Sequence, residues 1–146
     1  ALQQGDLATA ERYASEAAAI ASGSGWEATA LTLLAEVMIA KGALDSAEAI
    51  LRRAVTRALD TGLENWFRVG LRDLAQVTSL RGNHEKAALL TGASRRNMPN
   101  WGLNPMIYES VESASRTSLG PEAFEEATKT GLRMELDDLL EFALSE

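Results

Sequence analysis

Three short segments centred on glycine recur along the chain at nearly equal intervals, and this repetition constrains the fold most. They are Gln4-Gly5-Asp6-Leu7, Lys41-Gly42-Ala43-Leu44 and Arg81-Gly82-Asn83-His84, with the glycines 37 and 40 residues apart. A helix commonly ends on a residue in the left-handed backbone region, which costs a residue with a Cβ about 1 to 2 kcal/mol. We therefore expect each glycine to mark the turn of a helical hairpin in a repeated array.

Apolar residues flank Gly42 at the three- and four-residue intervals of a helix face. The two stripes are Leu31, Leu34, Ala35 and Met38 before it, and Leu44, Ala47, Leu51, Ala54 and Val55 after it. They predict two helices that pack across the turn, with Leu34 and Leu51 buried between them. The segment around Gly82 is a degenerate copy, since polar His84 and Thr91 follow it at the corresponding positions.

The copy at Gly5 is incomplete. Its following stripe is present as Leu7, Ala10, Ala14, Ala17 and Ala18, but only residues 1–4 remain of a preceding helix. We therefore expect the chain to be part of a longer polypeptide cut inside a repeat. The exposed apolar face should pair with another copy or lose order, and about 35 additional upstream residues should raise the melting temperature and abolish any such pairing.

Periodicity and capping signals predict an all-α chain without strands. We expect helices at about residues 7–21, 26–40, 45–60, 65–81, 84–97, 105–118, 121–130 and 135–145. Ser24 with Glu27, and Asp45 with Glu48, have the spacing of capping boxes. Asn104-Pro105 and Gly120-Pro121 are typical of helix starts. Residues 1–97 should form hairpins with the first repeat truncated, and residues 98–146 a connector and C-terminal helices packed on the array, in one domain.

Gly92 lies inside a predicted helix, where glycine costs about 1 kcal/mol relative to alanine. Close approach of a neighbouring helix is the favoured explanation, with a hinge as the alternative.

Composition argues against several kinds of site. The chain has no cysteine and one histidine, His84, so thiolate chemistry, disulfides and multi-histidine metal centres are excluded. No phosphate-binding GxxxxGK[ST] loop occurs, and Asp137-Asp138 fits the start of a helix, where the dipole stabilises acids. We expect no enzymatic activity, no metal and no cofactor in this segment; if a longer parent protein binds ATP, it does so in an upstream domain.

A net charge of −7 argues against a nucleic-acid surface. No apolar run approaches the roughly 20 residues of a membrane span. We expect a cytoplasmic protein with no nucleic-acid or membrane partner.

The small residues Ala47 and Ala54, the bulky Leu31, Leu34 and Leu51, and the turn at Gly42 make residues 1–97 resemble tetratricopeptide repeats. Residues 86–94, the segment Leu119-Gly120-Pro121-Glu122-Ala123-Phe124, and Gly131 before an acidic helix resemble the C-terminal end of large bacterial regulators of actinobacterial type. Those proteins join an ATPase to helical repeats and to a LuxR-type DNA-binding domain or an adenylate cyclase domain. The resemblance implies a regulatory module that contacts a protein partner, a peptide or small-molecule effector, or its own upstream domains.

In tetratricopeptide arrays the first helix of each pair lines the binding surface. The resemblance therefore implies partner contacts at Thr32, Glu36, Arg72 and Gln76. Trp26, Trp66 and Trp101 are either partly exposed packing residues or aromatic anchors for a partner.

Two other functions remain open. One is a self-contained helical small-ligand carrier or enzyme, and the other is a structural spacer or oligomerisation block. The lack of a convergent set of polar residues in the sequence favours the interaction module over a carrier or enzyme.

Overall fold

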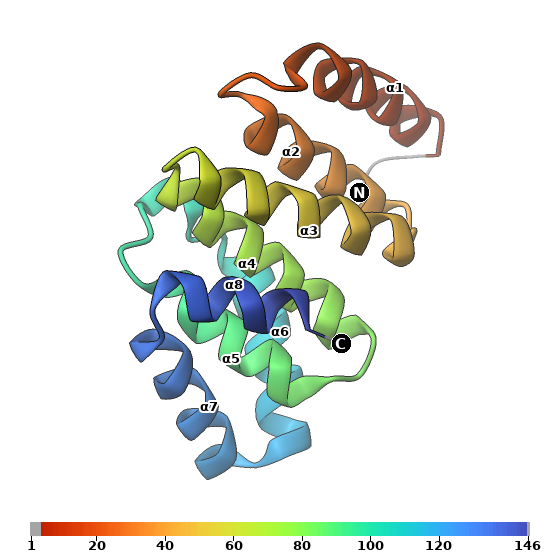
Figure 1. Ribbon diagram of the computed structural model, residues 1–146. Coiled ribbons are helices and arrows are strands. Elements are labelled where there is room, and N and C mark those ends of the chain that lie inside the picture. Colours follow the sequence, from red (N-terminus) through yellow and green to blue (C-terminus); the bar gives the residue numbers. More distant parts are fainter. Residues whose placement is uncertain (1–3, 146) are drawn as a thin grey trace.

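The computed structural model describes residues 4–145, which form eight α-helices and one short 3-10 helix and contain no strand (Figure 1). The helices are α1 (Gln4–Ala21), α2 (Glu27–Ala40), α3 (Leu44–Asp60), α4 (Glu64–Leu80), α5 (His84–Arg95), α6 (Pro105–Leu119), α7 (Pro121–Arg133) and α8 (Leu136–Leu144), with η1 (Asn100–Gly102) before α6. The all-α prediction is confirmed.

Tight glycine turns join the helices into stacked antiparallel hairpins. Gly42 and Gly82 have φ values of 79° and 87°, and the amide of Ala43 donates to the carbonyl of Met38 at 2.9 Å, as at a typical helix C-terminus. Gly62 (φ 73°) makes the same turn between α3 and α4. The turns therefore recur every 20 residues, twice as often as the sequence motif suggested.

The turn predicted at Gly5 is wrong. Gly5 lies in the first turn of α1, and a Cβ there would meet no atom within 4 Å. The helix therefore runs through this position without needing the freedom of glycine.

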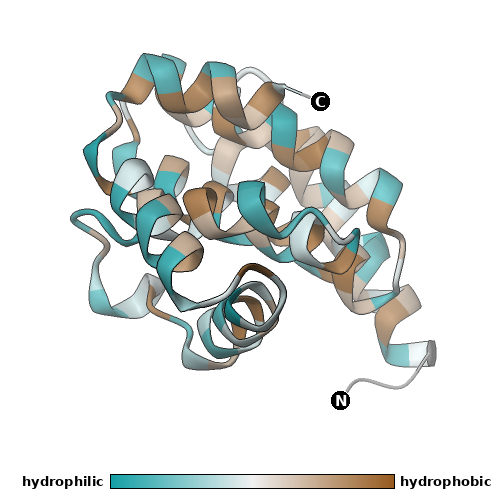
Figure 2. Ribbon diagram, turned by 90° about the horizontal axis from the view of Figure 1, so that it is seen from below, coloured by the Kyte–Doolittle hydropathy of each residue, from teal (hydrophilic) through white to brown (hydrophobic). Residues whose placement is uncertain are grey.

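The core lies between the hairpins and is built from apolar residues of α2 to α6 and of α8, whose ribbons alternate between apolar and polar segments (Figure 2). Leu51 is completely buried, as predicted, but Leu34 is only half-buried and lines a hollow among α1, α2 and α3. Leu31 and Ala35 occupy the buried positions of α2 instead. Since α2 packs against α1, α3 and α4, its apolar residues are spread around the helix and do not form one stripe.

The C-terminal helices depart from the regular stacking. α7 packs most extensively on α5 and only slightly on its sequence neighbour α6. Backbones touch at this crossing: a Cβ at Gly92 would overlap the carbonyl oxygen of Thr128 and lie 2.7 Å from the Cα of Thr128. A Cβ at Gly131 would overlap the carbonyl oxygen of Leu89. The close approach predicted from Gly92 is confirmed.

The last helix, α8, returns across the array and packs on α3 (Figure 1). Its Leu139 is completely buried in the main core, and Arg52 of α3 donates to the carbonyl oxygen of Leu144 at 2.6 Å.

The capping predictions have mixed outcomes. Asn104 caps α6 by accepting from the amides of Met106 and Ile107, and Pro121 opens α7. Glu27 accepts from the amide of Gly23 at 2.7 Å, one residue before the expected Ser24.

At the start of α3, Asp45 and Glu48 make no cap. Both bind Arg81 at the neighbouring turn, so the predicted capping box is an ion-pair cluster between successive hairpins.

Candidate functional site

A groove of about 480 Å³ lies along α2, α4 and α6, the helices that succeed one another on one side of the array. We call it the central groove. It is lined by Leu33, Glu36, Ile39, Ala40, Trp66, Val69, Arg72, Gln76, Trp101, Asn104 and Ile107.

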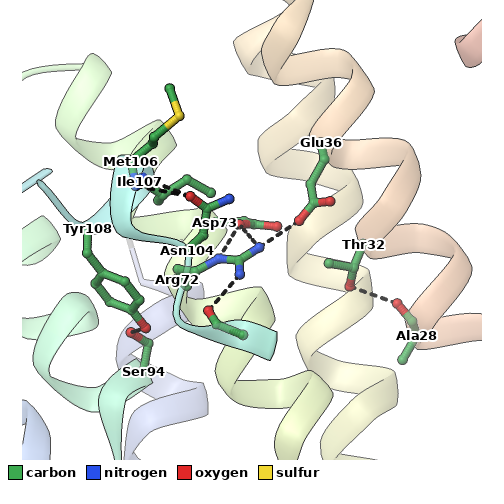
Figure 3. Close-up of polar contacts among 11 residues, drawn as sticks. Ala28, Thr32, Glu36, Arg72, Asp73, Ser94, Asn104, Met106, Ile107 and Tyr108 are labelled. Atoms are coloured by element: carbon green, nitrogen blue, oxygen red, sulfur yellow. Dashed lines mark hydrogen bonds and ion pairs between the residues drawn. The ribbon is translucent and has the colours of Figure 1, made fainter. Parts of the chain in front are cut away.

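Arg72 forms the charged floor of the central groove and lies between Glu36 and Asp73 (Figure 3). Its Nη2 donates to Oε2 of Glu36 at 2.7 Å, and its Nε donates to Oδ1 of Asp73 at 2.9 Å. Its Nη1 donates to the carbonyl oxygen of Gly102 at 2.8 Å. The guanidinium therefore ties together α2, α4 and the connector before α6.

Asp73 is 0% exposed, and its second carboxyl oxygen has no hydrogen-bond donor among the described residues. Burial raises the pKa of this carboxyl well above its ordinary value of 3.8, and the neighbouring Glu36 raises it further, while Arg72 opposes the rise. The Glu36, Arg72 and Asp73 cluster thus contains two carboxyl groups and one guanidinium, and it favours a proton on Asp73.

An aromatic pair forms one wall of the groove. The rings of Trp66 on α4 and Trp101 on η1 have centroids 5.2 Å apart and planes tilted by 43°, a favourable arrangement for indoles. Trp101 is 58% exposed while Trp66 packs against the core. The bond from Arg72 to Gly102 holds η1, and therefore Trp101, in this position.

A second groove of about 420 Å³, here called the N-terminal groove, lies between α1 and α2. Its lining is almost entirely apolar and consists of Tyr13, Ala14, Ala17, Ala21, Trp26, Thr29, Ala30 and Leu33. Leu33 lines both grooves and is 50% exposed. The two grooves therefore adjoin at Leu33.

Three of the four predicted contact residues, Glu36, Arg72 and Gln76, line the central groove. Thr32 does not. Its side chain is completely buried and donates to the carbonyl oxygen of Ala28 at 2.8 Å, which is incompatible with the predicted partner contact. One residue further along α2 turns the side chain by about 100°, and so Leu33 takes the outward position.

The pairing of Trp66 with Trp101 is not evident from the sequence, because the residues lie 35 positions apart and only the fold of the connector brings them together. Trp26 and Trp101 are exposed, and both lie on groove walls.

The polar residues that the sequence analysis weighed as candidate chemistry lie at helix starts. His84 is the first residue of α5, and Asp137 and Asp138 lie in the first turn of α8. Within residues 4–145, no group of three or more acidic, histidine or cysteine side chains is arranged to hold a metal ion. None of the helices in the described part of the chain has the length and apolarity needed to cross a membrane.

In a comparison with known protein families, residues 1–62 match the tetratricopeptide repeat model. No match was found among curated proteins or among solved structures. Together with the stacked hairpins, the family match shows that the chain contains a tetratricopeptide-like helical-repeat region.

Proposed function

We propose that this protein is an interaction module that binds a peptide segment of a partner protein in the central groove, with the N-terminal groove extending the contact. The observation that carries the proposal is the pair of grooves that adjoin at Leu33, on which Trp101, Trp26 and Leu33 remain exposed beside the hydrogen-bonded Arg72. Exposed aromatic and aliphatic side chains in a preformed groove are typical anchors for a partner. The proposal assigns the protein no catalytic role.

The same module fits a larger regulator. We propose that the parent is a bacterial transcriptional regulator of LuxR type or a related adenylate cyclase regulator, and that the bound segment belongs to a partner or to the regulator's own ATPase domain. The support is the resemblance of residues 86–94, 119–124 and 131 to the C-terminal end of such proteins, together with the repeat region. A peptide effector would use the same groove.

Two alternatives receive less support from the geometry. A small-ligand carrier normally surrounds most of its ligand, whereas Trp101 leaves the central groove open to solvent. A spacer or oligomerisation block would use the apolar α1 face and would leave the charged floor of the central groove without a role.

A peptide-display selection against the whole chain tests the proposal. Peptides that bind should lose about tenfold or more in affinity when Trp101→Ala removes an exposed anchor, as interface hot spots do. Leu132→Ala is the matched control, since Leu132 is an exposed apolar residue on α7 that lines neither groove. Selected peptides that bind the Trp101→Ala variant as tightly as the original chain would refute the groove as the binding site.

A further inference from the structure

We propose that the central groove selects a peptide with a cationic side chain, whose guanidinium or ammonium group lies between the Trp66 and Trp101 pair and the carboxylate of Glu36. This inference rests on the proposed function, because it names the chemistry of the peptide that occupies the groove.

The floor of the groove is poorly suited to an anionic ligand. Among the described residues, Arg72 is the one basic residue in the groove lining, and its Nε, Nη1 and Nη2 atoms already donate to Asp73, the Gly102 carbonyl and Glu36. Because Arg72 is only 6% exposed, an incoming carboxylate or phosphate would reach little of its guanidinium without disturbing these charge-assisted hydrogen bonds, which are the stronger kind.

Glu36, in contrast, is suited to bind a cation. It is the acidic residue of the lining, and its side chain is 35% exposed, whereas Asp73 beneath it is fully buried. Two carboxyl groups share one guanidinium, so the cluster lacks one positive charge when both are ionised. A second cation at the mouth of the groove would restore neutrality where solvent screening is reduced.

Burial and the neighbouring Glu36 raise the pKa of the Asp73 carboxyl, so a proton on Asp73 and a bound cation are alternative ways to balance this charge. The charged and titratable groups around Asp73 are Glu36 from α2, Arg72 on its own helix α4, and Tyr108 from α6. The Tyr108 hydroxyl is hydrogen-bonded to Ser94 of α5 at 2.7 Å, and burial raises its pKa, so it stays neutral and does not compete for the cation.

The Trp66 and Trp101 pair would provide a second contact with the cationic side chain of the peptide. Tryptophan binds cations through its ring face better than any other side chain. A planar guanidinium stacks on an indole while its edge donates to a carboxylate, so arginine satisfies both features at once. Glu36, Trp66 and Trp101 line the same groove, and their chemistry therefore favours arginine, with lysine second.

Two peptides that differ only in the charge of one side chain test the preference for a cationic side chain without changing the protein. A groove-binding peptide from the selection is synthesised with arginine or with citrulline, its neutral isostere, at the position that contacts the groove, and both affinities are measured by calorimetry. The arginine peptide should bind about tenfold or more tightly. The indole N–H signals of Trp66 and Trp101 should shift on binding in NMR spectra.

Glu36→Gln provides the matched variant, because glutamine still accepts from Arg72 but carries no charge. It should reduce arginine-peptide binding about tenfold and leave citrulline-peptide binding unchanged. Glu109→Gln is the control, since Glu109 is exposed on α6 outside the central groove.

The outcomes separate the two proposals. If both peptides bind equally and both are lost in Trp101→Ala, the inference about charge fails while the peptide-binding function stands. The inference about charge also fails, and the peptide-binding function stands, if the selected peptides carry no cationic residue. If no peptide depends on the groove, the proposed function fails and the inference fails with it.

Discussion

Burial of the Asp73 carboxyl beside Glu36 raises its pKa above 3.8, so the folded protein holds a proton that the unfolded chain releases near pH 4. The stabilisation from this difference is fully present below about pH 4 and is lost as the pH rises through the raised pKa of the folded state. In the Asp73→Asn variant, residue 73 cannot ionise, so the free energy of unfolding does not fall for this reason as the pH rises. Its free energy of unfolding should therefore increase relative to that of the original chain as the pH rises above 4.

Urea denaturation of both proteins between pH 4 and pH 8 measures this difference. All other titratable groups are the same in both proteins, so their contributions largely cancel in the comparison. A difference that stays constant over the whole range would show that Asp73 is ionised throughout in the folded protein.

Thr32 and Leu33 show why site residues are harder to predict from the sequence than helices are. The position of the binding face on α2 depends on which neighbours cover the helix, and α1, α3 and α4 all do. A sequence pattern gives the period of the apolar residues but not the direction in which each helix faces. Glu36, Arg72 and Gln76 line the central groove, and their contacts with a partner stay a prediction. Thr32 is buried, and the outward position on α2 belongs to Leu33, one residue further on.

Among the elements, the α2 and α3 hairpin makes the contrast between Leu51 and Leu34 testable. Leu51→Ala should cost about 2 to 5 kcal/mol, because it leaves a cavity in a fully buried site. Leu34→Ala should cost clearly less, since Leu34 lines an open hollow and water fills the space that is vacated. Chemical denaturation of the two variants measures both values, and equal costs would mean that Leu34 belongs to the core.

Helix boundaries were predicted within about three residues because caps and turn glycines are local signals. The packing of α7 could not be predicted in the same way, because no sequence pattern shows that α7 packs on α5 instead of on its sequence neighbour α6. The 20-residue spacing of Gly42, Gly62 and Gly82 was present in the sequence. It was missed because Thr61-Gly62 does not share the motif around the other two glycines.

For the whole molecule, stability should fall from the centre of the array towards α1. Among the described side chains of α1 only Ala21 is buried, whereas α4 buries a run of residues from Phe67 to Ala75. In repeat arrays each helix is stabilised mainly by its neighbours, so a helix covered on one side opens more readily. Backbone amides of α1 should exchange hydrogen about a hundredfold faster than those of α4.

Hydrogen exchange of the whole chain, resolved by residue, measures this gradient, with α5 as the internal reference for a covered helix. Equal protection in α1 and α4 would show that the array opens only as a single cooperative unit.

The crossing of α5 and α7 has a consequence for the evolutionary history of the chain. Gly92 and Gly131 each face backbone atoms of the other helix, so no side-chain replacement on one helix makes room for a larger residue on the other. Among homologues the two positions should therefore behave as a linked pair, with glycine at both or at neither. In lineages that lack both glycines, α5 and α7 should pack against each other differently. An alignment of homologues would then show at which branch of the family this change arose.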